Sequence, residues 1–560
     1  MGRYNLLREP WITVVTLETG IQKNISLLDL FSHAEEYQTL AGDMETQDFA
    51  VLRLLLSVLH TVFSRFDASG EPYFCIDLDE KMKQFAPVDE DDLDEYIKEL
   101  EETWAQIWKH GSFPEIVCAY LDKWSNRFNL FDEKHPFFQC TMAEMEKYLP
   151  PNKKASPIAG RNIKRIISES GNKKALFSPE IDDSKDLMSE AELARWLIML
   201  QGYTGLSDKT SLFEKNRQPS KGWLFDIGGL YLEGNNLFET LMLNYIPVHS
   251  LIQYRGKIES PCWELENGEV LNRQIKSDQV NSLAELYTNW SRAIVLDPNL
   301  DMKDPVMIGI AKLPAIQHTD QFLEPMTVWR YNQAGDAKDH FTPRKHLPEQ
   351  QLWRSFGLIT LSDSLQEHQR RPEILRQYDR VRRIAGNRNI AIRAVSMKDD
   401  GNATSWVPTD EIIDVLHLND IIITDDRKDG WVVRINSAVE DTKKIVEIEY
   451  GRFLADIVEI RGMDPAKEGS HYISIRKKEM YQQFDSPFRK WIEMLVPEDS
   501  IEAKLLQWNG ERKKIILNSV QSILDQAGER DYRGVTKKDG STMNIVTSYL
   551  SLMKRLRKYG

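Results

Sequence analysis

The chain has 560 residues, of which 41% are hydrophobic and 28% are charged. This composition allows a sizeable buried core and excludes a chain that is disordered throughout. The formal net charge of −14 argues against a general polyanion-binding protein. No stretch approaches the ~18 uninterrupted apolar residues of a membrane span, and the first residues lack the pattern of a signal peptide. We therefore expect an intracellular, cytoplasmic protein without membrane contact.

The N-terminal part predicts a mixed α/β domain. Two short strands, at 11–17 and 21–25, are expected around a tight turn. Residues 46–66 are apolar on nearly all sides, which predicts a helix buried inside this domain. We interpret His60 in that helix as a core histidine rather than a catalyst. The acidic run at 89–102 is typical of a solvated helix face and lacks the ligand order of a calcium loop.

Two basic, irregular stretches follow. Residues 150–189 contain glycine, proline, serine and lysine with little periodicity, so we expect a long loop. A helix is predicted at 190–201, and a second basic, irregular stretch at 208–222. Two polar basic loops are therefore expected to flank one helix.

The central part alternates between expected strands and helices. We predict strands at 223–232 and 326–332, and a helix at 283–294 with Ser282 as its N-cap. A turn at 334–336 should follow the second of these strands.

An arginine-rich tract leads into a predicted hairpin. Residues 370–393 contain eight arginines and two acids, in a helix expected from about residue 363. A strand is predicted at 389–397, followed by a turn at 398–404 with Asp-Gly at its centre and a returning strand at 405–407. On charge alone, a phosphate-binding surface and a solvated helix face are equally good interpretations of the tract.

The C-terminal part predicts long helices with short connections, which is typical of an antiparallel four-helix bundle. The expected helices span 430–461, 471–494, 499–527 and 541–558. The predicted fold class is α+β, with a large mixed α/β N-terminal domain at 1–424 and the four-helix bundle at 425–560.

A search for chemistry yields no candidate catalytic residue. The sequence contains no phosphate loop, dinucleotide-binding glycine motif, H-E-x-x-H or G-x-S-x-G. Its four cysteines are far apart and lack metal-ligand spacing, so we expect neither a zinc site nor disulfides. We expect no cofactor. The residues by themselves indicate a non-catalytic, multi-domain binding protein whose ligand is nucleic acid, contacted by basic loops and a hairpin.

Several segments, in order, resemble the CasA family, the large subunit of the type I-E CRISPR surveillance complex Cascade. The similar segments are residues 4–12 (YNLLREPWI), 124–131 (WSNRFNLF), 135–139 (HPFFQ), 222–224 (GWL), 228–229 (GG) and 234–241 (GNNLFETL). The resemblance runs nearly from end to end. It implies a non-catalytic subunit that recognises the protospacer-adjacent motif (PAM) in double-stranded DNA, helps to open the duplex for R-loop formation and recruits the effector helicase-nuclease.

The resemblance also implies partners and binding residues. The other Cascade subunits and the crRNA 5′ handle are expected partners. A loop of the N-terminal domain contacts the handle in the family, and its aromatic residue corresponds to Phe177. An exposed aromatic beside lysines can stack on a base while the ammonium groups hold phosphates. The expected handle-binding residues are Lys173, Lys174, Phe177 and Ser178.

The family reads the PAM from the minor groove with a glycine-rich loop, a lysine finger and a glutamine-bearing hairpin wedge. The glycine loop corresponds to Lys215, Asn216 and Arg217, where this chain lacks the glycines. The lysine finger corresponds to Lys312. The wedge corresponds by position to Gly401, Asn402 and Ala403, and Asn402 replaces the glutamine, so its amide can still donate to minor-groove acceptors. Gln333, in the tripeptide Asn-Gln-Ala, is the alternative wedge residue.

Two other functions remain open. A protein-only scaffold subunit would use the basic tracts to contact acidic subunits. A nucleic-acid-modifying enzyme would need a metal-binding cluster of carboxylates or histidines, which the sequence does not reveal.

Overall fold

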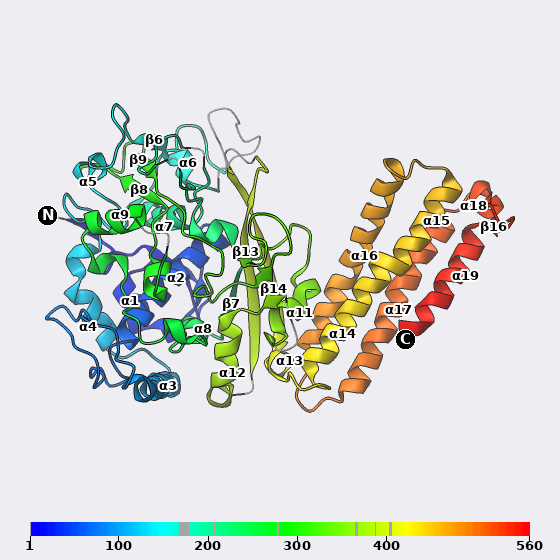
Figure 1. Cartoon of the computed structure of the whole chain (residues 1–560), viewed down its shortest axis with the longest axis horizontal. Helices are drawn as coiled ribbons and strands as arrows, with labels where there is room; N and C mark the ends of the chain where they lie inside the picture. The colour runs from blue at the N-terminus through cyan, green and yellow to red at the C-terminus, as the bar shows by residue number, and fades with distance from the viewer. Residues whose placement is uncertain are drawn as a thin grey trace. The chain divides into compact units, whose positions relative to one another are not determined.

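The structure is a computed structural model in which the described residues are 2–166, 179–206, 208–214, 216–276, 279–363, 368–386, 388–402 and 406–559. The chain divides into two compact units. Unit 1 comprises Met1–Pro348, Glu367–Gly386 and Ala391–Val415, and unit 2 comprises Glu349–Gln366, Asn387–Ile390 and Leu416–Gly560. The expected mixed α/β character is confirmed (Figure 1).

Short strands and helices alternate in the first part of the chain. The strands up to residue 419 are β1 (Arg3–Asn5), β2 (Ile12–Thr16), β3 (Gln22–Ile25), β4 (Tyr37–Leu40), β5 (Asn129–Phe131), β6 (Ser156–Ala159), β7 (Gly229–Glu233), β8 (Arg292–Val295), β9 (Met307–Lys312), β10 (Trp329–Tyr331), β11 (Phe341–Pro343), β12 (Gln369–Arg370), β13 (Asn389–Asp399) and β14 (Pro408–Asn419). The α-helices of unit 1 are α1 (Leu27–Ser32), α2 (Glu45–Phe63), α3 (Leu93–His110), α4 (Ile116–Lys123), α5 (Met142–Glu146), α6 (Gly160–Ile163), α7 (Glu190–Gly202), α8 (Leu237–Asn244), α9 (Asn267–Lys276), α10 (Leu283–Tyr287) and α12 (Glu373–Ala385).

The predicted N-terminal hairpin is confirmed. Strands β2 and β3 pair antiparallel, with Ile12 opposite Ile25, and β4 adds to the other edge of β2. Ile12 and Val14 are buried on one face of β2, and Thr13 between them is buried as well, so both faces of the start of this strand are covered.

Helix α2 is the buried helix that the apolar run predicts. It is long and apolar enough to cross a membrane, but 94% of its most apolar window is buried inside the structure, as in the core helix of a folded domain. His60 is buried, and this burial lowers its pKa to about 3, so the imidazole is neutral. The interpretation of His60 as a core histidine is confirmed.

A second sheet, in the order β6-β9-β8, corrects two predictions. The expected loop at 150–189 contains strand β6 and helix α6, because β6 pairs with β9, about 150 residues further along the chain. The expected helix at 283–294 ends at Tyr287, and Arg292–Val295 forms strand β8. An apolar run such as Ala293-Ile294 fits a helix or a strand equally well, and its pairing with β9 decides in favour of the strand.

A third sheet, in the order β14-β13-β7, carries the predicted hairpin and corrects three more boundaries. The expected strand at 223–232 is a short 3-10 turn, Trp223–Asp226, followed by β7. The arginine-rich helix begins only at Glu373, because Pro372 disfavours the helical conformation in the residue before it. The returning strand begins at Pro408 rather than 405–407, because Trp406 has a φ of +44°, which no strand accommodates.

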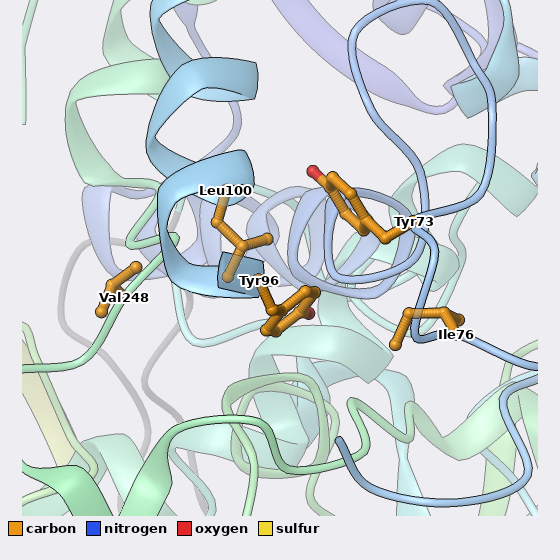
Figure 2. Packing of buried hydrophobic residues seen from close by; sticks show 5 residues of the cluster. All are labelled: Tyr73, Ile76, Tyr96, Leu100 and Val248. Carbon is orange, nitrogen blue, oxygen red and sulfur yellow. The ribbon is translucent and has the colours of Figure 1, made fainter. Parts of the chain in front are cut away.

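The acidic run at 89–102 lies on the exposed face of helix α3 only from residue 93 on, because residues 89–92 precede the helix, and the opposite face of α3 packs into the domain. Figure 2 shows the packing of Tyr96 and Leu100 from this helix with Tyr73, Ile76 and Val248. The rings of Tyr73 and Tyr96 meet edge to face at 5.4 Å, and each hydroxyl donates a hydrogen bond, to Thr103 and Ser64 respectively.

Unit 2 is dominated by long helices that lie close to the predicted ranges (Figure 1). Its helices are α11 (Phe356–Thr360), α13 (Ile421–Thr424), α14 (Trp431–Lys444), α15 (Gly451–Arg461), α16 (Glu468–Glu493), α17 (Ile501–Asp525), α18 (Glu529–Arg533) and α19 (Ile545–Leu556). A π-helical segment, Ile445–Tyr450, joins α14 to α15. Helix α18 and the small β15-β16 pair (Val535–Thr536 and Thr542–Met543) were not predicted.

The core of unit 2 is rich in aromatic residues. Helix α16 packs against α15 and α17, and α14 packs against α17. Trp508 of α17 is buried and stacks on Trp491 of α16, with ring centroids 5.4 Å apart. The side chain of Trp353 stacks on Phe488 and donates a hydrogen bond to Asp485. Trp508 is therefore part of the packing between α16 and α17.

Candidate nucleic-acid interface

A buried arginine holds both ends of the second basic stretch, in unit 1. Arg292 lies at the start of β8 and is fully buried. Its guanidinium forms an ion pair with Asp208 at 2.9 Å and donates to the carbonyls of Gly205 at 2.6 Å and Ser220 at 2.7 Å. Desolvation lowers the pKa of Arg292, and Asp208 opposes that shift. Residues 205 and 220 are therefore tied to one point of the sheet.

A second, half-buried arginine lies beside the first. Arg165 donates a hydrogen bond to the carbonyl of Thr204 at 3.1 Å. Burial and the positive charge of Arg292 lower its pKa to about 10. Two guanidinium groups therefore lie close to the entry of the same stretch, with Asp208 as the carboxylate that acts on both.

The stretch continues along the end of β9. Backbone hydrogen bonds join Lys312 to Thr210 and Leu212, and Leu313 to Ser220. The basic, irregular character expected at 208–222 is confirmed for its described residues, which contain only isolated bridges. The stretch has little regular structure of its own and is held in place by Arg292 and by backbone hydrogen bonds to the end of β9.

The candidates of the glycine loop and the lysine finger lie in different environments. Asn216 is exposed. Arg217 donates a hydrogen bond to the carbonyl of Ile275. Lys312 donates its ammonium group to the carbonyl of Leu206 at 3.0 Å, and burial lowers its pKa. Its ammonium group is thus directed at the segment that precedes the basic stretch. Lys215 lies outside the described residues.

The hairpin between β13 and β14 has a tip shaped by two aspartates. Asp399 accepts a hydrogen bond from the backbone N–H of Gly401, and Asp400 accepts from those of Asn402 and Val407. These are Asx-type turn interactions. Gly401 has a φ of +69°, with open space around it, and Asn402 is exposed. Ala403 lies outside the described residues, as do Lys173, Lys174, Phe177 and Ser178.

The hairpin and the basic stretch meet. The ammonium group of Lys221 lies 4.7 Å from the ring centroid of Trp406, a cation–π distance. Gly205 has a φ of +77°, and a Cβ added there would lie only 2.4 Å from the carbonyl oxygen of Trp406. Two segments about 200 residues apart in sequence are therefore in direct contact.

This contact gives a testable requirement for glycine at position 205. We expect Gly205→Ala to lower the free energy of unfolding by about 1–3 kcal/mol, because it combines a left-handed backbone with a clash against Trp406. Denaturant unfolding measures the loss, and hydrogen exchange at 398–402 and 406–408 should increase. The control is Gly335→Ala, whose φ is +82° but whose Cβ would meet nothing within 4 Å. Equal costs for both variants would contradict the proposed clash.

The alternative wedge residue lies on another hairpin. Gln333 is exposed in the turn between β10 and β11, where Gly335 has a φ of +82°. Exposure on a hairpin tip therefore does not distinguish Gln333 from Asn402.

Several arginines of the 370–393 tract have internal partners. Arg376 and Arg380 lie 3.2 and 3.7 Å from the carboxylate of Glu373. Arg371 forms an ion pair with Asp379, and Arg393 with Glu233. Arg370 lies 4.1 Å from the ring centroid of Phe322. These five residues support the fold, so the tract as a whole is not a free phosphate-binding surface.

Sequence reasoning missed the residues that position the site, Arg292, Asp208, Arg165 and Gly205. Arg292 and Asp208 are 84 positions apart, and no local spacing connects them. A cluster of three or more histidines, cysteines or carboxylates that could hold a metal ion is absent from the described part of the chain.

The chain is similar to CRISPR-associated proteins. The family model of CRISPR-associated protein Cse1 matches residues 5–519. The CRISPR-associated protein CasA/Cse1 of Thermus thermophilus is 26% identical over 371 residues, which cover 64% of this chain and 60% of that protein, less than two thirds of its length.

Two solved structures have a similar fold. The crystal structure of Thermobifida fusca Cse1 matches with a TM-score of 0.75 at 24% identity, covering 100% of this chain and 98% of that one. A chain of a structure described as a CRISPR RNA-guided surveillance complex matches with a TM-score of 0.61 at 15% identity, covering 99% and 100%. At these identities the likeness concerns the fold.

Proposed function

The chain belongs to the CRISPR-associated protein Cse1 family, and from this premise we propose that it is the non-catalytic large subunit of a CRISPR RNA-guided surveillance complex of the Cascade type. The support is the family match over residues 5–519, together with the end-to-end fold similarity to a chain of such a complex. The expected partners are the other subunits and the crRNA, whose 5′ handle would be held by the segment containing Phe177. The proposed location is the cytoplasm.

Within that role, the subunit recognises the PAM of double-stranded DNA through the minor groove and starts duplex opening. The observation that carries this proposal is the contact between the basic stretch and the hairpin, at Lys221, Gly205 and Trp406. Because of this contact, the basic stretch, which would bind backbone phosphates, and the hairpin tip, which would insert at a base step, would contact the same few base pairs. Exchange of the DNA duplex for a guide hybrid is nearly balanced in energy, so a wedge need supply only a few kcal/mol.

The long C-terminal helices complete the proposal. We assign residues 425–560 to a four-helix bundle that contacts neighbouring subunits, and residues 1–424 to the domain that carries the nucleic-acid-binding loops. Recruitment of the effector helicase-nuclease is proposed for the assembled complex.

The second candidate function is a scaffold subunit that contacts only proteins. The internal pairing of the arginines at 371, 376, 380 and 393 withdraws these charges from a phosphate backbone and from acidic subunits alike, so such a scaffold would contact its partners through other surfaces.

The test is PAM-dependent binding of labelled duplex DNA by the reconstituted, guide-loaded complex. We expect the double variant Asn402→Ala with Ala403→Gly to weaken binding of PAM-containing duplex by about tenfold or more, while complex assembly persists, since base-reading contacts contribute ~1–3 kcal/mol. The matched control is Gln333→Ala on the other exposed turn. If only Gln333→Ala removes PAM dependence, the wedge assignment is wrong. If the wild-type chain joins no such complex, the proposed function is wrong.

A further inference from the structure

A positively charged cavity of about 640 Å³ lies next to the β10–β11 hairpin of unit 1. Its lining includes Lys221, Arg330, Arg344 and Lys345, with Asp226 as the only carboxylate among the lining residues. The volume is in the range of pockets that hold a nucleotide-sized ligand. None of the residues predicted from the sequence to bind nucleic acid lines this cavity.

The two arginines of the cavity, Arg330 and Arg344, lie close together, and no carboxylate forms an ion pair with either of them among the described residues. In the β10–β11 pair, Arg330 is opposite Thr342, so Arg344 lies diagonally across on the same face, at a typical separation of about 7–8 Å. Among the residues that the structure describes, neither guanidinium has a hydrogen-bond or ion-pair partner. Burial and the charge of Arg330 lower the pKa of Arg344. Two positive charges this close repel each other, and a bound anion would remove that repulsion.

Two lysines also line the cavity, and both are held in place by other residues. Lys221 forms an ion pair with Asp226 at 2.7 Å, and Lys345 forms one with Asp399 at 3.5 Å. Their ammonium groups lie 5.2 and 4.4 Å from the ring centroid of Phe225. The lysines are therefore positioned by carboxylate and aromatic partners, whereas the guanidinium donors of the two arginines have no such partner among the described residues.

We propose that this cavity is a phosphate-binding site in which Arg330 and Arg344 bind phosphate oxygens as forked donors, supported by Lys345 and Lys221. Each lysine already has a carboxylate partner, Asp226 or Asp399, so the positive charge left without a partner is that of the two arginines. A phosphate offers several acceptor oxygens to two planar guanidinium groups at once. The phosphate can come from the phosphodiester backbone of a nucleic-acid strand or from a free phosphate compound. The proposal needs neither a guide RNA nor a PAM.

The test uses the purified full chain and two probes, a fluorescein-labelled oligothymidylate and inorganic pyrophosphate. For a nucleic-acid phosphate, Arg330→Gln with Arg344→Gln should weaken oligothymidylate binding about tenfold, and should reduce the slope of log affinity against log salt by about 1.4. For a free phosphate, pyrophosphate should raise the melting temperature of the wild-type chain but not that of the variant, while oligothymidylate binding is the same in both.

The matched control is Lys303→Gln with Lys338→Gln, which removes the same charge from two exposed sites outside the cavity. We expect this control to bind oligothymidylate as the wild-type chain does and to show the same change of melting temperature with pyrophosphate. Without ligand, the cavity variant should melt no lower than wild type, because the change relieves repulsion between like charges. The proposal is overturned if the cavity variant and the control behave alike with both probes, or if the wild-type chain binds neither probe.

Discussion

Replacing Arg292 with methionine is expected to lower the free energy of unfolding by about 3–5 kcal/mol, because the change leaves a buried carboxylate without its partner. The side chain of Asp208 is 4% exposed and pairs with Arg292 at 2.9 Å. The same substitution removes the donors to the carbonyls of Gly205 and Ser220. Unsatisfied buried carbonyls add to the cost.

The effect should be concentrated in the basic stretch. Chemical denaturation gives the loss of stability, and hydrogen exchange should increase at the described residues of 204–221. The control is Arg8→Met, which removes an ion pair with Asp122 whose side chains are 61% and 47% exposed. Exposed pairs contribute about 1 kcal/mol or less. If Arg292→Met costs no more than Arg8→Met, Arg292 does not hold the stretch in place.

Glu324→Ala is expected to have a comparable effect at a second buried ion pair of unit 1. Both oxygens of Glu324 accept from the guanidinium of Arg53 at 2.8 Å, and the side chains are 0% and 2% exposed. Glu324 also accepts from the indole N–H of Trp223 at 2.6 Å. Removing the carboxylate leaves a buried guanidinium and a buried indole without an acceptor, at an expected cost of about 3–5 kcal/mol.

A double variant distinguishes loss of the pair from loss of packing. Arg53→Met with Glu324→Leu replaces both charges with apolar groups of similar size, and should recover most of the stability lost in Glu324→Ala. The measurement is the unfolding free energy of the single variants Arg53→Met and Glu324→Leu and of the double variant. A double variant as unstable as the sum of the two singles would mean that the energy comes from the surrounding packing and not from an uncompensated charge.

The two ion pairs have a consequence for the proposed function. Arg292 ties the basic stretch to the sheet β6-β9-β8, and Glu324 ties Trp223, immediately after that stretch, to helix α2. The segment that meets the hairpin tip is thus fixed at both sides. A preorganised loop loses less conformational entropy when it binds DNA than a mobile one does.

The sequence predicted elements whose signal is local. The β2–β3 hairpin follows from strand patterns on either side of a tight turn, and α2, α16 and α17 follow from apolar periodicity and from breaks at glycine and proline. The family resemblance was equally accessible, because its motifs are contiguous in sequence. It is confirmed by the family match.

The errors occurred where distant pairing decides the structure. Ala293-Ile294 has no preference between helix and strand until β9 pairs with it, and the pairing of β6 with β9 is invisible to any local pattern. Arg393 is a further case, because its partner Glu233 lies 160 residues before it and neutralises it only in the folded chain. The other paired arginines of the tract have their acids, Glu373 and Asp379, inside the tract itself.

The sequence by itself therefore determined the family, the mixed α/β class, the buried helix and the long C-terminal helices, since all of these rest on neighbours in the chain. The tertiary structure alone decided that the basic stretch meets the hairpin at Trp406, that Arg292 holds that stretch, and that Arg330 and Arg344 share a cavity. Contacts between residues tens to hundreds of positions apart produce no recognisable spacing in the sequence, because such residues come together only after the sheets have formed.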